Sequence, residues 1–250
     1  MKIKLNTIPK VILGPLAIDL IPKTELIDLI TDAAREKNSL TVCTPNLQFY
    51  GTVKKDPPKG NLCRAFDYSV ADGWPISLAA SLKSKKIVKR IIGSELLPLL
   101  IEKNKNSGID LLIIGGHKKD AEKIESCFKD LKNVSVVIPP ENLTVENLVK
   151  FVNHEQRLSL RPRIVIICLG FPLQEEAGLQ IAKLWKSPVI CLGASLDFYI
   201  GIKQRAPWIF RKLLLEWLWR LISEPKRLWR RYLLVSAPSI ISLTKDVFYD

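Results

Sequence analysis

The chain has 250 residues and a formal net charge of +13, with 38 Lys and Arg against 25 Asp and Glu. A hydrophobic fraction of 47% and a charged fraction of 25% are typical of a globular protein and exclude an intrinsically disordered one. The length allows one large domain, or one domain with an appendage. The excess of positive charge favours an anionic partner, which can be nucleic acid, an anionic membrane or a diphosphate.

The cysteines and the apolar runs indicate the compartment. Five cysteines, odd in number and without a CxxC pair, favour buried thiols in a reducing cytoplasm over disulfides or a zinc site. No stretch reaches the roughly 18 uninterrupted apolar residues of a spanning helix. The first twenty residues lack a cleavable signal pattern, because Pro15 and Asp19 interrupt the apolar run. We therefore expect a cytoplasmic protein that lies peripherally on the inner face of the cell membrane.

The first half of the chain reads as short, mixed elements. The hydrophobic spacing predicts, in order, a strand and turn at 11–21, an amphipathic helix at 24–37, a buried strand at 40–43, a strand at 68–70 and a helix at 76–82. Residues 51–61 are rich in Pro, Gly and Lys, which is typical of an exposed loop.

From residue 110 the chain alternates regularly between apolar strands and helices. The predicted strands are 111–114, 134–138, 164–169 and 189–192, and the helices between them are 119–131, 143–156 and 174–185. Continuous apolar runs alternating with helices indicate a mainly parallel sheet with helices on both faces, a Rossmann-like α/β fold.

Polar and glycine residues follow these apolar runs, at the positions where strands end. In open α/β sheets ligands bind outside the carboxyl ends of the strands, so this placement predicts a binding site there. The residues that share it are Thr44, Asn46, Asp72, Gly115, Gly116, Gly170, Gln174 and Gly193.

Each of these motifs also has a purely structural interpretation. Gly115-Gly116 can hold a phosphate or nucleoside at a helix start, or form only a tight turn. Asp72-Gly73 is a common turn pair, and Asp72 can equally serve as a general base. Gln174 can bind a sugar or uracil through its amide or stay structural, and the acidic residues at 175 and 176 can be simple helix-dipole partners.

The two histidines and the metal motifs add little. His117 and His154 have no visible partners and are interpreted as ordinary surface residues. The sequence contains no D-x-D pair, so the metal clamp common in nucleotide-sugar enzymes is missing. A departing diphosphate would then need Arg, Lys or helix N-termini to stabilise its charge. We expect no metal and no cofactor.

The C-terminal segment 201–232 concentrates charge and aromatic surface. It carries nine basic residues against two acidic ones, together with four of the six tryptophans. We predict two helices separated at Pro225, and divide the chain into an α/β domain at 1–200 and a basic, Trp-rich helical appendage at 201–250. Tryptophans among arginines favour an anionic membrane surface over a merely solvated face, and oligomerisation is a second use for the apolar surface.

Several ordered motifs together resemble the WecG/TagA/CpsF family of bacterial glycosyltransferases. They run from about residue 11 to residue 232 in the family's order. The motifs are Thr44-Pro45-Asn46, Ala71-Asp72-Gly73-Trp74-Pro75, Arg90 with Gly93, Leu112 to Gly116, Gly170-Phe171-Pro172-Leu173-Gln174-Glu175, Gly193 with Asp197 and Gly201, Arg205-Ala206-Pro207-Trp208, Glu216-Trp217 with Arg220-Leu221, and Glu224-Pro225 with Arg227.

The resemblance implies an inverting, metal-independent transferase. Its donor would be a UDP-sugar, typically of N-acetylmannosamine or a related hexose derivative, and its acceptor an undecaprenyl-diphosphate-linked sugar in teichoic acid or cell-surface polysaccharide assembly. Asp72 would be the catalytic base. The substrate-binding residues implied are Thr44, Asn46, Gly73, Arg90, Gly115, Gly116, Gln174, Glu175, Arg205, Arg220 and Arg227.

Two other functions remain open from the residues alone. The charge and the aromatic tail also suit an α/β protein that binds nucleic acid, although such a protein leaves the strand-end cluster without a task. A membrane-surface adaptor that has lost activity would keep the same fold. The transferase interpretation, which we favour, predicts no nucleic-acid partner.

Overall fold

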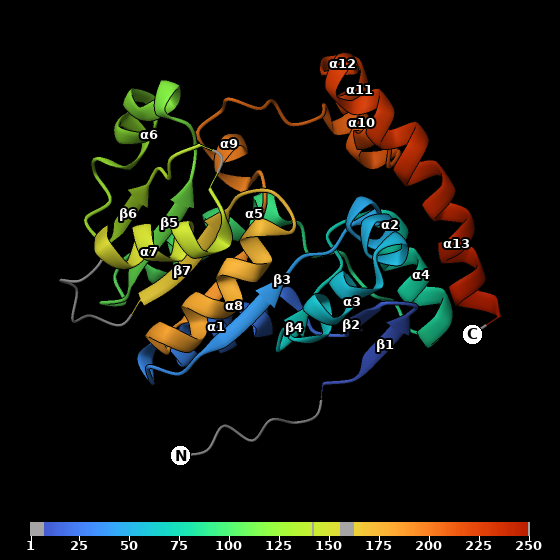
Figure 1. The fold of residues 1–250 in the computed structure, drawn as a ribbon, viewed down its shortest axis with the longest axis horizontal. Helices are drawn as coiled ribbons and strands as arrows, with labels where there is room; N and C mark the ends of the chain where they lie inside the picture. The colour runs from blue at the N-terminus through green and yellow to red at the C-terminus, as the bar shows by residue number, and fades with distance from the viewer. Residues whose placement is uncertain (1–7, 142, 156–162, 250) are drawn as a thin grey trace.

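The centre of the protein is a six-stranded parallel sheet (Figure 1). The computed structural model describes residues 8–141, 143–155 and 163–249, and within these ranges a few side chains, that of Arg227 among them, are not described. The strand order is β4 (Tyr68–Ser69), β3 (Leu40–Cys43), β8 (Pro188–Cys191), β7 (Arg163–Cys168), β5 (Asp110–Gly115) and β6 (Val134–Val137). The predicted Rossmann-like α/β fold is confirmed.

Helices cover both faces of the sheet because successive strand side chains point in opposite directions. Leu111 and Ile113 of β5 pack on one side, whereas Leu112 and Ile114 pack on the other. The first side is covered by α1 (Lys23–Arg35), α5 (Gly93–Asn104), α6 (Ala121–Phe128, after a short 3-10 turn at Lys118–Asp120) and α9 (Ser195–Tyr199). The second side is covered by α7 (Val145–Glu155) and α8 (Leu173–Trp185).

A second hydrophobic core lies beside the sheet. It is built on an antiparallel hairpin, and its buried side chains include Leu13, Ile18, Tyr50 and Ile76. The elements around it are β1 (Lys10–Leu13), β2 (Leu16–Asp19), α2 (Leu47–Lys55), α3 (Pro57–Arg64) and α4 (Trp74–Ser84).

The exposed loop predicted at 51–61 is wrong, since all of these residues except Asp56 lie in α2 and α3. The side chain of Asn46 accepts hydrogen bonds from the N–H groups of Gln48 and Phe49 and so caps α2. Pro57 is at the start of α3. The absence of an N–H group in proline costs nothing there, because the first N–H groups of a helix form no hydrogen bond within the helix. Gly51, inside α2, is buried, and a Cβ there would lie 2.0 Å from Ser239 Oγ. The glycine therefore allows close helix contact.

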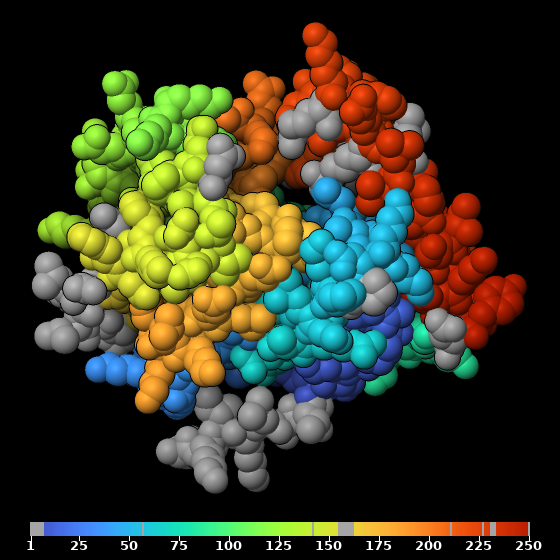
Figure 2. All heavy atoms as spheres, in the orientation of Figure 1, coloured from blue at the N-terminus to red at the C-terminus, as the bar shows by residue number. Residues whose placement is uncertain are grey.

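The C-terminal segment contains more helices than the predicted pair. Pro225 does begin a helix, but further helical segments lie before and after it. They are α10 (Trp208–Lys212), α11 (Glu216–Ser223), α12 (Pro225–Arg230), a π-helical segment (Arg231–Ser236) and α13 (Ala237–Phe248). In Figure 2 these helices form a ridge along one side of the molecule. None of the helices that the structure describes is long and apolar enough to cross a membrane.

The last helix, α13, is joined to the second core. Leu243 is buried in the same cluster as Tyr50. The carboxylate of the buried Asp246 accepts a 2.6 Å hydrogen bond from the Tyr50 hydroxyl and a 2.7 Å hydrogen bond from Lys54 Nζ. A Cβ on Gly14 would lie 2.0 Å from Asp246 Oδ2, so the hairpin turn also closes on this carboxylate. Helix α13 therefore completes the packing of the second core.

The predicted burial of the cysteine side chains is confirmed at the three positions that lie inside apolar runs. Cys43, Cys168 and Cys191 are buried and free, as is Cys63. Cys127 is exposed and also free. Burial raises the pKa of the Cys168 thiol to about 12, so this thiol stays protonated and packs as a small apolar group.

Candidate active site

A cavity of about 820 Å³ lies at the carboxyl end of the parallel sheet. The segments that follow β3, β4, β5, β7 and β8 contribute to its walls, and α11 contributes Trp219 and Arg220. It is therefore bounded by the α/β body on one side and by the C-terminal helices on the other. A volume of this size accommodates a small organic ligand.

The cavity brings together most of the residues predicted for the site. Those that line it are Thr44, Asn46, Asp72, Gly116, Gln174, Glu175 and Arg220. Four others, Gly73, Arg90, Gly115 and Arg205, are not among the described residues of its walls. The side chain of Arg227 lies outside the described part of the structure.

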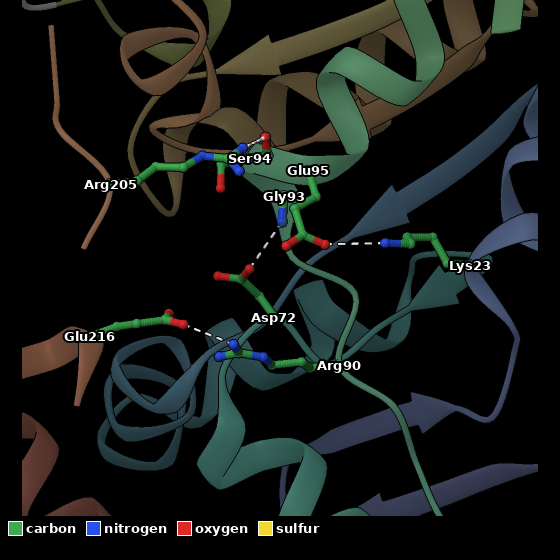
Figure 3. A network of polar contacts seen from close by, with 8 residues as sticks. All are labelled: Lys23, Asp72, Arg90, Gly93, Ser94, Glu95, Arg205 and Glu216. Carbon is green, nitrogen blue, oxygen red and sulfur yellow. Dashed lines mark hydrogen bonds and ion pairs between the residues drawn. The ribbon is translucent and has the colours of Figure 1, made fainter. Parts of the chain in front are cut away.

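Asp72 follows β4 and is held at the edge of the cavity. Its N–H donates to the carbonyl of Pro45 at 3.1 Å, and its Oδ1 accepts a 3.0 Å hydrogen bond from the N–H of Gly93, the first residue of α5 (Figure 3). Burial raises the pKa of the Asp72 carboxyl, while the Gly93 hydrogen bond and the Arg220 charge oppose that rise. An oriented carboxylate with a raised pKa is suited to accept a proton.

Thr44 and Asn46 line the cavity and also support its walls. Thr44 Oγ1 donates to the carbonyl of Cys191 at 3.0 Å, which joins the ends of β3 and β8. Asn46 Oδ1 accepts both capping hydrogen bonds of α2, and the Asn46 side chain also acts to lower the pKa of Asp72. Gly73 packs on Asn46, since a Cβ there would lie 3.5 Å from Asn46 Cβ.

The double glycine after β5 allows a close approach of neighbouring segments. Gly115 has a φ of 157°, and a Cβ there would lie 2.7 Å from the carbonyl oxygen of Cys168. Gly116 has a φ of 85°, and its Cβ would lie 2.6 Å from Ile124 Cδ1. Gly115 thus requires glycine because a side chain would meet backbone atoms, whereas Gly116 favours glycine because of its positive φ, and Gly116 also faces the cavity.

Gln174 and Glu175 begin α8 beneath the cavity. Gln174 Oε1 accepts hydrogen bonds from the N–H groups of Leu169 and Gly193, and its Nε2 donates to Glu175 Oε1 at 2.7 Å. Glu175 is only 1% exposed, and burial raises the pKa of its carboxyl to about 7. The amide of Gln174 is thus held by the protein itself, and its predicted contact with substrate remains a prediction.

The arginines divide into two groups. Arg220 lines the cavity and lies 5.0 Å from the ring centre of Phe198. Arg90 instead forms a 2.8 Å ion pair with Glu216 of α11, and Arg205 donates to the carbonyl of Ser94 (Figure 3). The Arg90–Glu216 pair joins α11 to the body beside Asp72, and the Arg205 contact joins the stretch before α10 to the start of α5.

The structure adds residues that the sequence analysis did not select. His117 was assigned to the ordinary surface, but it lines the cavity. Its position directly after Gly116, at a strand end, was the signal that could have identified it. Asp197 and Lys203 also line the cavity and form a 2.5 Å ion pair, and Trp219 reaches it from α11. Trp219 could not be separated by pattern from the three tryptophans around it.

The charge-bearing groups of the cavity define its chemistry. Two carboxyl groups with a raised pKa, those of Asp72 and Glu175, line the cavity together with the Arg220 guanidinium, and the Arg220 charge acts on Asp72. The described part of the chain contains no group of three His, Cys, Asp or Glu side chains placed to hold a metal ion. The site therefore offers a proton acceptor beside a cation that can pair with a phosphate.

Comparisons with known proteins show the family of the chain. The chain is 26% identical over 205 residues to an N-acetylglucosaminyldiphosphoundecaprenol N-acetyl-beta-D-mannosaminyltransferase of Staphylococcus aureus strain MW2, covering 79% of this chain and 78% of that protein. The proteins of the same name in strains NCTC 8325 / PS 47 and COL match to the same extent. The family model "Glycosyl transferase WecG/TagA/CpsF family" matches residues 11–249. The chain is thus a glycosyltransferase and belongs to the WecG/TagA/CpsF family.

Proposed function

We propose that the protein transfers N-acetylmannosamine, or a closely related hexose derivative, from a UDP-sugar to an undecaprenyl-diphosphate-linked sugar, with inversion and without a metal ion. The acceptor proposed follows the name of the Staphylococcus aureus relatives. The observation that carries the proposal is the oriented Asp72 carboxylate, with its raised pKa, in a cavity at the strand ends. The product would serve teichoic acid or cell-surface polysaccharide assembly.

In the proposed reaction Asp72 removes the proton from an acceptor hydroxyl. The hydroxyl oxygen then forms a bond to the anomeric carbon of the donor sugar, while the bond from that carbon to the UDP oxygen breaks. UDP leaves with the bonding electron pair, and Asp72 holds the proton. A single displacement of this kind inverts the anomeric configuration, because the nucleophile enters opposite to the leaving group.

The leaving diphosphate needs positive charge, and Arg220 is the described arginine that lines the cavity. A guanidinium can donate two parallel hydrogen bonds to phosphate oxygens. Arg220 also lowers the pKa of Asp72, which keeps more of that carboxyl ionised. We assign Arg220 to the diphosphate of the donor or of the lipid-linked acceptor.

The C-terminal helices are the proposed contact with the membrane. Trp208 is 61% exposed, Trp217 40% and Trp229 43%. Lys212 Nζ lies 5.5 Å from the ring centre of Trp208, and the Arg230 guanidinium lies 5.2 Å from that of Trp229. Exposed tryptophans beside Lys and Arg suit the interface of an anionic membrane, where a lipid-linked acceptor would lie. The protein would then act peripherally at the cytoplasmic face.

A donor panel tests the reaction. The protein is incubated with UDP-N-acetylmannosamine, UDP-N-acetylglucosamine or UDP-glucose and a synthetic prenyl-diphosphate-N-acetylglucosamine acceptor, with and without EDTA. We expect transfer from the first donor and no loss with EDTA. Activity abolished by EDTA and restored by Mg²⁺ would refute the metal-independent mechanism. Absence of transfer from every UDP-sugar, with thermal stabilisation by nucleic acid instead of UDP, would favour the nucleic-acid alternative.

Vesicle binding tests the membrane contact. Trp208→Ala and Trp229→Ala together are expected to weaken sedimentation with phosphatidylglycerol vesicles several-fold, because they remove exposed aromatic surface. Leu184→Ala removes an apolar side chain, 59% exposed, from the far end of α8 and serves as the control. Equal sedimentation of all three proteins would exclude this membrane role.

A further inference from the structure

The amide of Gln174 connects two strand ends. Its Oε1 accepts a 3.3 Å hydrogen bond from the N–H of Leu169, just past β7, and a 3.0 Å hydrogen bond from the N–H of Gly193, just past β8. Leu169 and Gly193 both line the cavity. One oxygen atom therefore sets the spacing of two cavity loops.

Glu175 determines which way this amide is turned. A glutamine amide can rotate by half a turn and exchange its oxygen for its NH₂ group. In the rotated form the NH₂ would face the N–H groups of Leu169 and Gly193, and three groups of donors would meet. Glu175 Oε1, which accepts from Gln174 Nε2 at 2.7 Å, stabilises the orientation that presents the oxygen.

The surroundings of Glu175 are unusual for an acidic side chain. It is 1% exposed, and its Oε2 has no hydrogen-bond partner among the described atoms. The titratable groups that interact with it electrostatically are the thiols of Cys43 on β3, Cys63 on α3 and Cys191 on β8, and the neighbouring Glu176 on α8. Burying an incompletely satisfied carboxyl costs folding free energy. We therefore expect the buried Glu175 carboxyl to have a role that offsets this loss of folding free energy.

The loop after β8 connects this amide to the catalytic base. Beyond Gly193, Ser195 Oγ donates to the carbonyl of Leu192 at 2.6 Å. Gly93 packs closely on this loop, since a Cβ there would lie 3.0 Å from Ser195 Oγ and 3.2 Å from the Leu192 carbonyl oxygen. The N–H of Gly93 holds Asp72. A shift of the loop would thus displace the hydrogen-bond donor of the base.

We propose that Glu175 is a positioning residue that fixes the orientation of the Gln174 amide. Through its hydrogen bonds to Leu169 and Gly193, this amide holds the cavity loops in place, and these loops in turn fix the position of the Asp72 carboxylate. This role deepens the proposed function and rests on it for the assignment of Asp72 as the base. The bridge itself is a property of the fold and can be measured without the reaction.

Amide hydrogen exchange tests the bridge directly. In Glu175→Met the side chain keeps its length but loses the strong acceptor, whereas Glu175→Gln keeps an acceptor oxygen. We expect the amides of Leu169 and Gly193 to exchange roughly three- to tenfold faster in the Met variant than in the native protein, as for the loss of one hydrogen bond. They should remain protected in Glu175→Gln and in the control Glu176→Gln. The β5 amide of Ile113 should not change.

Kinetics test the consequence for the reaction. Glu175→Met should lower kcat about tenfold or more at a temperature where the protein is folded, with the KM for the donor within about threefold. Glu175→Gln should recover most of the rate. Gln174→Met breaks the same bridge from its other partner, and the double variant should be no slower than the slower single variant, because both remove one interaction.

The outcomes separate this proposal from the proposed function. Native exchange rates for Leu169 and Gly193 in both Glu175→Met and Gln174→Met would overturn the positioning role, whatever the enzyme does. A change in KM alone, with kcat unchanged, would overturn it in favour of direct substrate binding by Glu175. If the native protein transfers no sugar, the proposed function fails, and the exchange measurements still decide whether the bridge exists.

Discussion

The Gly93 N–H donates to Asp72 Oδ1 at 3.0 Å, so the first residue of α5 holds the carboxylate that follows β4. The start of a helix carries unpaired N–H groups and partial positive charge, which favours an ionised carboxyl. Burial acts in the opposite direction and is the larger effect, since the pKa of Asp72 is raised. The result is a fixed carboxylate that is more basic than an exposed one.

Asp72→Asn should abolish most of the transfer activity. The amide oxygen of Asn can still accept from Gly93, so the fold is kept, but the side chain can no longer take a proton. We expect kcat to fall by about 10²- to 10⁴-fold, with UDP affinity unchanged. The check is single-turnover transfer together with UDP titration by calorimetry, and the exposed Asp130→Asn serves as the control. Turnover near that of the native enzyme would remove Asp72 from the base role.

The Arg90–Glu216 ion pair should act as a clamp between the body and α11. Its side chains are 23% and 30% exposed, so the pair is partly protected from solvent. Arg90→Ala and Glu216→Ala should each lower kcat/KM about three- to tenfold, in line with a coupling of about 1 kcal/mol. The charge-swapped double variant Arg90→Glu with Glu216→Arg should recover much of the loss.

The same series decides between the clamp and a substrate contact for Arg90. If Arg90 binds substrate, the charge swap will not recover activity and Glu216→Ala alone will have little effect. Lys103→Ala is the control, because its ion pair with Asp28 joins side chains that are 48% and 57% exposed.

Asp246→Ala should destabilise the whole protein. It removes the acceptor for Tyr50 and Lys54 from a side chain that is 4% exposed. Loss of hydrogen bonds to a buried charged group costs about 2–3 kcal/mol, which corresponds to a drop in Tm of roughly 5–10 °C for a chain of this size. Differential scanning fluorimetry measures it, and the exposed Asp28→Ala should shift Tm far less. Equal shifts would show that the Tyr50 and Lys54 contacts of Asp246 contribute nothing to stability.

Glu175 should make stability depend on pH near neutrality. Burial raises its pKa to about 7, well above the usual 4.3 or so, so the folded protein keeps a proton that the unfolded chain has released. This contribution to stability is complete below about pH 4 and is lost as the pH rises through about 7, an effect on the order of 3 kcal/mol. Relative to the native protein, Glu175→Gln should therefore gain Tm between about pH 5 and pH 8.

The matched comparison isolates this group from other buried acids. The pKa values of Asp19 and Asp72 are also raised by burial, so the native protein alone will show a composite pH dependence. These two groups are present in both proteins, and their effects cancel in the difference. A Tm difference that does not change with pH would show that Glu175 has an ordinary pKa.

The parallel sheet and the position of the site could be read from the residues. Strands such as β7 and β8 are buried on both faces, and a run of branched apolar residues leaves few alternatives to such a strand. The polar residues at strand ends then had to meet at one edge of the sheet. Asp72, Thr44 and Asn46 do so in the cavity.

The local sequence pattern predicted secondary structure less well where tertiary packing overrides composition. Residues 51–61 read as a loop, but the Asn46 cap and the second core make them helical. The helix α5, which contains Pro98, was not predicted. His117 was assigned to the ordinary surface, although its position directly after Gly116 places it at a strand end, and the turn after β5 brings it to the cavity.

The sequence by itself determined the alternating core, the strand-end cluster and the identity of Asp72 as the carboxylate beside them, because these follow from local periodicity and chain order. Only the tertiary structure decided what the distant polar residues do. Arg90 meets Glu216, Tyr50 meets Asp246, and Gln174 is used by two backbone N–H groups. Such contacts depend on which segments the folded core brings together, and no spacing along the chain encodes them directly.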